Sequence, residues 1–186
     1  MTHHAASTIL IDAIPPTPEV VETYSVGQEL KALAFKTIAI IVSALLLFTF
    51  VYGLHYNVEP GMYPSIKDGD LVMYSRWSKD YRAGDLLMLR TQGKTHVRRV
   101  VAIAGDTVDI TEQGLVINGS LQQEPDIKQE TNRYAEGVDF PLTISEGEVF
   151  VLGDARDGAT DSRIYGAAKE GDTEGTVISV LRRRNL

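Results

Sequence analysis

The stretch V-E-P-G-M-Y-P-S-I-K-D-G-D, residues 58–70, stands between two very different parts of the chain. A long apolar run ends just before it, and short apolar runs separated by glycine turns follow it. This change predicts a membrane-spanning segment followed by a β-rich domain, with residues 58–70 presented where the two meet. Within the stretch, Gly61 has no side chain that could take part in chemistry.

The apolar run from Thr37 to Leu54 contains 18 residues and no charge. About 20 apolar residues are needed to cross the hydrocarbon core of a bilayer, which is about 30 Å thick. We therefore predict a transmembrane helix and assign residues 37–56 to the anchor. A buried helix of a soluble protein would show a polar stripe. A cleaved signal peptide would lie nearer the N-terminus and have a shorter apolar core.

The sequences on either side of this run set the expected topology. Residues 1–36 contain three prolines and scattered acids without a sustained helical or strand period, so we predict a disordered tail. Lys31 and Lys36 precede the span, whereas Lys67 is the first lysine after it. The positive-inside rule then places the tail in the cytoplasm and residues 57–186 outside the membrane.

Residues 57–186 are predicted to form an all-β domain. Gly-Asp or Gly-Glu pairs precede several short apolar runs, which is the pattern of a turn followed by a strand. Asn118-Gly119 lies between the apolar run Leu115–Ile117 and Leu121 and predicts a two-residue hairpin. The polar segment 122–137 is predicted to be a long loop or an inserted hairpin. The expected strands are Leu71–Tyr74, Leu86–Leu89, His96–Ile103, Thr107–Ile110, Leu115–Ile117, Val149–Leu152 and Thr176–Leu181.

The composition excludes several classes of function. The chain has 186 residues, 44% of them hydrophobic, which is enough for one domain with a packed core. Its net charge of −7 disfavours nucleic-acid binding. It has no cysteine, so disulfides and cysteine nucleophiles are excluded, and its four histidines do not cluster in ligand spacing. We expect neither a metal ion nor a cofactor.

Three motifs follow the apolar run, and their order and spacing are informative. They are P-G-M-Y-P-S at residues 60–65 (the first motif), V-R-R-V-V-A-I-A-G-D at 97–106 (the second motif) and V-F-V-L-G-D-A-R-D-G-A-T-D-S-R-I-Y-G at 149–166 (the third motif). Together they resemble the type I signal peptidase family, over residues 57 to about 180. The resemblance implies a membrane-anchored endopeptidase with a catalytic domain of coiled β-sheets. In that family a serine nucleophile and a lysine general base remove signal peptides outside the membrane.

The first motif departs from the family at its reactive positions. The family pattern S-x-S-M-x-P-T has the nucleophile at its second serine and an oxyanion-hole hydroxyl at its first. Met62 and Pro64 match this pattern. Gly61, however, stands at the nucleophile position and Glu59 at the oxyanion position. Glycine has no group that can attack a peptide bond, and a carboxylate would repel the developing oxyanion.

The second and third motifs also differ from the family at catalytic positions and match it at positions expected to be structural. The family pattern K-R-x-x-G-x-x-G-D has the base at its first position, which is Arg98 here. An arginine side chain stays protonated near neutral pH and cannot act as that base. The family serine that orients the lysine is replaced by Ala159. The matching residues of the third motif are expected to hold the fold together through ion pairs and turns: Asp154, Arg156, Asp161, Ser162 and Arg163.

These replacements predict a naturally non-catalytic homologue with no intact catalytic residue. An alternative is an active signal peptidase that uses a displaced serine, Ser65 or Ser162, with Lys67 or Lys94 as the base. A third hypothesis is a structural subunit that modulates an active peptidase in the same membrane. The candidates for lining a peptide groove are Glu59, Pro60, Met62, Pro64 and Arg98.

We also predict an ion pair between Glu59 and Arg98. A permanent cation in a partly buried site needs an anionic partner or must reach water. Glu59 lies two residues before Gly61, on the same face of the chain if that segment is extended. The alternatives are an ion pair of Arg98 with Asp154 or Asp161, or a solvated Arg98.

The expected partners follow from the family resemblance. Some signal-peptidase-like proteins without the catalytic pair belong to pilus-assembly systems of Gram-positive bacteria. The resemblance therefore suggests a membrane-anchored, chaperone-like binding factor for exported proteins, with a pilin or a pilin-polymerising sortase as partner. An extended segment of the partner would add to strand edges through main-chain hydrogen bonds, which need no catalytic side chain.

Overall fold

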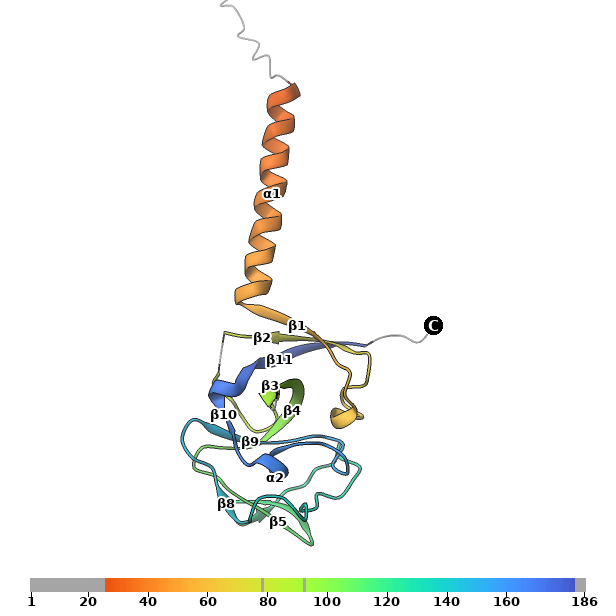
Figure 1. Cartoon of the computed structure of the whole chain (residues 1–186), viewed down its shortest axis with the longest axis vertical. Helices are drawn as coiled ribbons and strands as arrows, with labels where there is room; N and C mark the ends of the chain where they lie inside the picture. The colour runs from red at the N-terminus through yellow and green to blue at the C-terminus, as the bar shows by residue number, and fades with distance from the viewer. Residues whose placement is uncertain (1–25, 78, 92, 183–186) are drawn as a thin grey trace, which may run out of the picture. The chain divides into compact units, whose positions relative to one another are not determined.

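The computed structural model describes residues 26–77, 79–91 and 93–182 (Figure 1). Its first element is the helix α1 (Val26–Phe50), none of whose residues is buried. The helix is long and apolar enough to cross a membrane. This finding fits the predicted membrane anchor.

The bounds of α1 differ from the predicted anchor at both ends. The helix begins at Val26, so residues 26–36, predicted as part of a disordered tail, are helical. The leucine, alanine, lysine, glutamate and glutamine residues in this segment are strong helix formers. Residues 1–25 lie outside the described chain. Tyr52–Tyr56, predicted as part of the anchor, instead forms strand β1, because it pairs with β2 (Leu71–Ser75).

The rest of the described chain folds into two antiparallel sheets, which confirms the all-β prediction. The larger sheet has the strand order β1-β2-β11-β3-β4-β9-β10 and the smaller one β7-β6-β5-β8. Figure 1 shows β5 and β8 at the end of the domain remote from β1 and β2. The remaining elements are η1 (Pro60–Met62), β3 (Leu86–Thr91), β4 (Lys94–Ile103), β5 (Thr107–Thr111), β6 (Gly114–Ile117), β7 (Ser120–Leu121), β8 (Leu142–Thr143), β9 (Glu148–Leu152), α2 (Ser162–Tyr165), β10 (Ala168–Lys169), η2 (Glu170–Asp172) and β11 (Thr173–Leu181).

Each predicted strand falls within an observed one. The hairpin prediction is also confirmed, because Ile117 pairs with Ser120 across Asn118-Gly119. Both turn residues have positive φ, 51° at Asn118 and 78° at Gly119, as a two-residue hairpin of this type requires. Segment 122–137 contains neither helix nor strand, so it is the long loop and not the inserted hairpin.

Three clusters of buried apolar side chains form the core, and one of them supports the first motif. Met62 and Ile66 have 1% and 0% of their surface exposed. Burying side chains of this size contributes about 1.5–3 kcal/mol each. This burial fixes η1 against the larger sheet. The members of this cluster are Met62, Ile66, Val72, Tyr74, Met88 and Val97.

Candidate functional site

Asn57 is hydrogen-bonded to both ends of the segment that contains the first motif. The buried Asn57 side chain donates hydrogen bonds from Nδ2 to the carbonyl oxygens of Glu59 (2.8 Å) and Lys67 (3.0 Å). The backbone N–H of Asn57 donates to the carbonyl of Asp70 at 2.8 Å. These bonds tie both ends of the segment together and hold η1 in place.

Gly61 connects the first motif to the third. Its carbonyl oxygen accepts a hydrogen bond of 3.0 Å from the backbone N–H of Ala155. A Cβ added at Gly153 would lie 2.5 Å from the same carbonyl and 2.2 Å from the Cβ of Ala159. Glycine at position 153 therefore permits this close approach of the two motifs.

Glu59 and Arg98 form a bidentate ion pair, which confirms the predicted contact. Nη1 of Arg98 donates to Oε2 of Glu59 at 2.8 Å, and Nη2 donates to Oε1 at 2.7 Å. Nε donates to the carbonyl of Thr160 at 2.9 Å, and Nη1 also donates to the carbonyl of Val97 at 2.5 Å. The side chain of Arg98 is 0% exposed and that of Glu59 34%.

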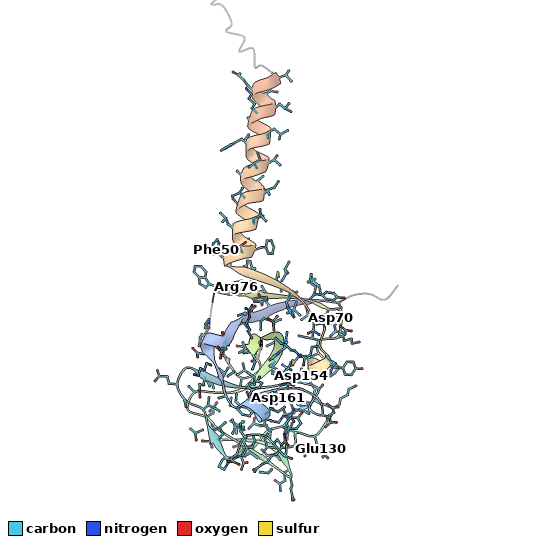
Figure 2. All side chains as sticks on the ribbon, in the orientation of Figure 1. Phe50, Asp70, Arg76, Glu130, Asp154 and Asp161 are labelled. Atoms are coloured by element: carbon cyan, nitrogen blue, oxygen red, sulfur yellow. The ribbon has the colours of Figure 1, made fainter. Side chains whose placement is uncertain are left out.

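Asp154 and Asp161, the two alternative partners of Arg98, each form an ion pair with another arginine. Asp154 accepts two hydrogen bonds from Arg99, at 2.8 and 2.6 Å. Asp161 pairs with Arg163 at 2.8 Å. Figure 2 labels both carboxylates, which lie in the interior of the β domain.

The ion pair occupies the space into which a side chain at position 61 would point. A Cβ added at Gly61 would lie 2.6 Å from Oε1 of Glu59 and 3.1 Å from both Nη1 and Nη2 of Arg98. Contacts below 3.0 Å require some atom to move. The observed positions of Glu59 and Arg98 therefore leave no room for a side chain at position 61.

Arg98 determines the charge state of Glu59. Burial acts to raise the pKa of the Glu59 carboxyl, but the hydrogen bonds and charge of Arg98 bring it below its usual value, with smaller contributions from His96 and Lys94. Glu59 is therefore ionised near neutral pH. The site holds a carboxylate beside a guanidinium. The guanidinium cannot take a proton from a hydroxyl, and the lowered pKa makes the paired Glu59 carboxylate a weaker base than the family's neutral lysine.

A cavity of about 560 Å³ lies beside the ion pair, and we call it the β4 cavity. Of the predicted groove candidates, only Glu59 and Arg98 line it. Met62 is buried in the core, and Pro60 and Pro64 do not contribute to the lining of this cavity. Sequence reasoning missed the other members, which come from β3, β4 and two loops. The lining residues are Val58, Glu59, Thr91, Lys94, Thr95, His96, Arg98 and Thr160.

His96 is the most perturbed titratable group of the β4 cavity. Its side chain is 7% exposed, and Nε2 has no hydrogen-bond partner among the described residues. Burial, followed by the charge of Arg98, lowers the pKa of His96 to about 4. The imidazole is therefore neutral near pH 7.

This lowered pKa makes the stability of the domain depend on pH. In the unfolded chain a histidine titrates near 6.5, so the unfolded state binds a proton first as the pH falls from 6.5 towards 4. We expect His96 to reduce the free energy of unfolding by roughly 3 kcal/mol over this window, with no effect above it. Urea unfolding of the protein and of His96→Gln at pH 7.5 and 4.0 measures the difference. An equal acid loss in both proteins would contradict the prediction.

The remaining residues of the third motif make buried structural contacts. The Asp161 carboxylate accepts from the backbone N–H of Gly153 and from Arg163. Arg156 pairs with Glu124 at 2.5 Å and donates from Nε to Thr131 at 2.9 Å. These partners of Arg156 lie in the polar loop 122–137, and no local sequence signal pointed to them.

The two displaced-serine candidates have other partners. The buried Ser162 hydroxyl accepts from the backbone N–H of Val151 at 3.0 Å. The Ser65 hydroxyl lies 3.5 Å from Nη2 of Arg99, a guanidinium that cannot accept a proton. Neither hydroxyl is hydrogen-bonded to a lysine among the described residues. No group of three described histidine, aspartate or glutamate side chains is placed to hold a metal ion.

Comparison with known proteins identifies the family. The family model described as signal peptidase, peptidase S26, matches residues 30–181. Signal peptidase I U of Bacillus subtilis (strain 168) is 28% identical over 169 residues, which cover 83% of this chain and 90% of that protein. Signal peptidase I of Bacillus licheniformis is 33% identical over 135 residues, covering 66% and 72% respectively.

A solved structure gives a further match. The crystal structure of a signal peptidase I from Enterococcus faecalis V583 aligns with a TM-score of 0.45 and 26% identity, over 53% of this chain and 97% of that one. The match of the family model alone extends over most of the chain, from within α1 to the end of β11. This chain therefore belongs to the signal peptidase family, peptidase S26.

Proposed function

We propose that this protein is a non-catalytic member of the signal peptidase family, one that binds exported polypeptides without cleaving them. The observation that carries the proposal is the Glu59–Arg98 ion pair at Gly61. The salt bridge occupies the space where the side chain of a nucleophile would lie, and the permanent cation of Arg98 stands at the position of the base.

Hydrolysis by the family's mechanism needs three groups that this site lacks. A serine hydroxyl must be activated by a neutral base, and here position 61 has no hydroxyl and position 98 is an arginine. Donors must also stabilise the oxyanion, and losing one typically costs about 10²–10³ in rate. Glu59 supplies an acceptor where a donor is needed.

Binding needs none of these groups, and one edge of β4 supports it. Lys94–Arg98 pairs with β3 on one side, whereas β9 joins β4 only from Arg99 onward. Within the described chain, the second edge of Lys94–Arg98 therefore has no strand partner. An extended polypeptide can add there through main-chain hydrogen bonds.

The proposed setting is the outer face of a cell membrane. α1 is the single-pass anchor, the N-terminus is cytoplasmic and the β domain is extracytoplasmic. The bound polypeptide is an exported protein, such as a pilin, and the protein acts as its chaperone-like factor, with a sortase as a further partner.

A cleavage and cross-linking assay tests the proposed function. The full chain in lipid nanodiscs is incubated with a preprotein carrying an A-x-A site, and products are followed by gel electrophoresis. We expect no cleavage, and we expect a photo-cross-linker placed at Thr95 to capture the exported polypeptide. Cleavage that persists in the natural Gly61 protein and disappears in Ser65→Ala would instead establish an active peptidase with a displaced nucleophile.

Restoring only the catalytic pair is expected to give no activity. In Gly61→Ser/Arg98→Lys, the new Cβ would meet the Glu59 carboxylate, which lies 2.6 Å from its ideal position. The same carboxylate would pair with the new lysine and keep it protonated, so it could not act as a base. The nanodisc assay with the A-x-A preprotein measures the result. Strong turnover by this double variant would refute the prediction.

A further inference from the structure

The β4 cavity differs in chemistry from a site for small apolar residues. Seven of its eight lining residues are polar or charged, and the remaining one, Val58, is 69% exposed. Because strand side chains alternate, Lys94, His96 and Arg98 share one face of β4, whereas Val97 points into the core. One wall of the cavity is therefore a row of three nitrogen-bearing side chains.

The charges of this row do not cancel. Glu59 neutralises Arg98, and His96 is uncharged near pH 7. Lys94 is exposed and forms no ion pair within the described part of the chain. The cavity therefore has an excess of one positive charge, although the whole chain carries −7.

His96 adds an unsatisfied hydrogen-bonding group to this local charge. Leaving a buried polar group without a partner costs about 1–3 kcal/mol, and Nε2 of His96 is such a group. A neutral imidazole can donate from Nε2 when the proton resides there. Nε2 itself is covered, so a ligand in the cavity that His96 lines accepts this bond only when the ring turns towards it, and the new bond then relieves the cost.

A carboxylate fits these features best. It accepts hydrogen bonds without needing to donate, and it compensates the charge of Lys94. The unpaired edge of β4 at Lys94–Arg98 lies along the same cavity and can hold the main chain that carries the carboxylate. The volume of about 560 Å³ accommodates more than one residue of an extended segment.

We propose that the β4 cavity selects an acidic residue, aspartate or glutamate, in the extended polypeptide that this protein binds, and that Lys94 and His96 recognise its carboxylate. This inference rests on the proposed binding function and specifies its ligand. The global negative charge of the chain opposes acidic ligands, so any preference for them must arise locally.

Fluorescence anisotropy with matched peptides tests the inference. The full chain is reconstituted in nanodiscs of zwitterionic lipid and titrated into labelled ten-residue peptides of serine, threonine and glycine. Each peptide carries one aspartate, at one of three adjacent central positions, and its partner peptide carries asparagine there. We expect the best aspartate peptide to bind about tenfold more tightly than its asparagine partner. The ratio should shrink in 0.5 M salt.

Four variants locate the preference. Lys94→Met should abolish the aspartate-to-asparagine ratio, whereas Lys67→Met, which removes an exposed lysine outside the β4 cavity, should keep it. His96→Phe should reduce the ratio, and His96→Gln, which retains a donor, should preserve most of it. Circular dichroism confirms that each variant is folded.

The outcomes separate this inference from the proposed function. Equal binding of aspartate and asparagine peptides, or a preference that survives Lys94→Met, overturns the acidic selection and leaves peptide binding intact. Failure of every peptide to bind, or cleavage of the peptides, overturns the proposed function and the inference with it.

Discussion

The variant Asp161→Asn is expected to lose about 3–5 kcal/mol of unfolding free energy, the usual cost of breaking a buried ion pair by removing one partner. The side chains of Asp161 and Arg163 are 0% and 1% exposed. Asparagine keeps the shape but not the charge, so the Arg163 guanidinium would remain buried with only neutral acceptors. These are the carbonyl oxygens of Arg156, at 2.7 Å, and Asn132, at 3.1 Å, the Tyr134 hydroxyl at 3.4 Å, and the amide oxygen of the new asparagine.

The same substitution also weakens the connection between motifs. The Asp161 carboxylate accepts from the backbone N–H of Gly153 at 3.0 Å, and Gly153 lies against the carbonyl of Gly61. A charge-assisted acceptor is stronger than the amide that would replace it. The loss therefore extends to the contact that holds the first motif against the third.

Urea unfolding followed by circular dichroism measures the change, and Asp80→Asn provides the matched control. Asp80 and Arg82 form a pair 3.8 Å apart whose side chains are 81% and 80% exposed. Exposed pairs of this kind contribute about 0–1 kcal/mol. A loss below about 1 kcal/mol for Asp161→Asn would show that the buried pair is not a main support of the fold.

The sequence predicted elements whose signals are local. The strands follow alternating apolar runs between glycine turns, and the hairpin at Asn118-Gly119 follows from two residues that tolerate positive φ. The Glu59–Arg98 ion pair could be predicted because a buried arginine needs an anion and the motifs brought one candidate near. In each case the physical cause lies within a few residues or in the pairing of known motifs.

Features that depend on distant contacts escaped prediction. Tyr52–Tyr56 is apolar enough to read as the end of the anchor, and only its pairing with Leu71–Ser75 makes it a strand. The partners of Arg156, Glu124 and Thr131, belong to a polar loop without periodicity. The short helix α2 did carry a local signal, since its N-cap Asp161 accepts from the backbone N–H of Arg163.

The β4 cavity was predicted only in part for a related reason. The motifs named residues that lie close in sequence to Gly61, but a groove forms from residues that are close in space. Met62 is within the first motif and yet serves the core. His96 and Lys94 lie before the second motif and line the cavity. Alternation along β4 would have grouped them with Arg98.

The largest effect at the candidate site is expected from breaking the Glu59–Arg98 pair. Removing the carboxylate should cost more unfolding free energy than removing the guanidinium. Glu59→Gln leaves Arg98, whose side chain is fully buried, without its counter-charge, and should cost about 3 kcal/mol. Arg98→Met leaves Glu59, which is 34% exposed and can turn towards water, so it should cost less, about 1–2 kcal/mol. The double variant Glu59→Gln/Arg98→Met should be more stable than Glu59→Gln alone, because no unpaired charge remains.

Urea unfolding of the four proteins in one double-variant cycle measures these differences and gives the coupling energy directly. Residues in contact within an ion pair typically couple by about 0.5–3 kcal/mol, whereas distant residues add independently. Strict additivity, or a greater cost for Arg98→Met than for Glu59→Gln, would show that the guanidinium is stabilised mainly by the Thr160 and Val97 carbonyls. The predicted order instead makes Glu59 the residue that allows a permanent cation to occupy the position of the family's catalytic base.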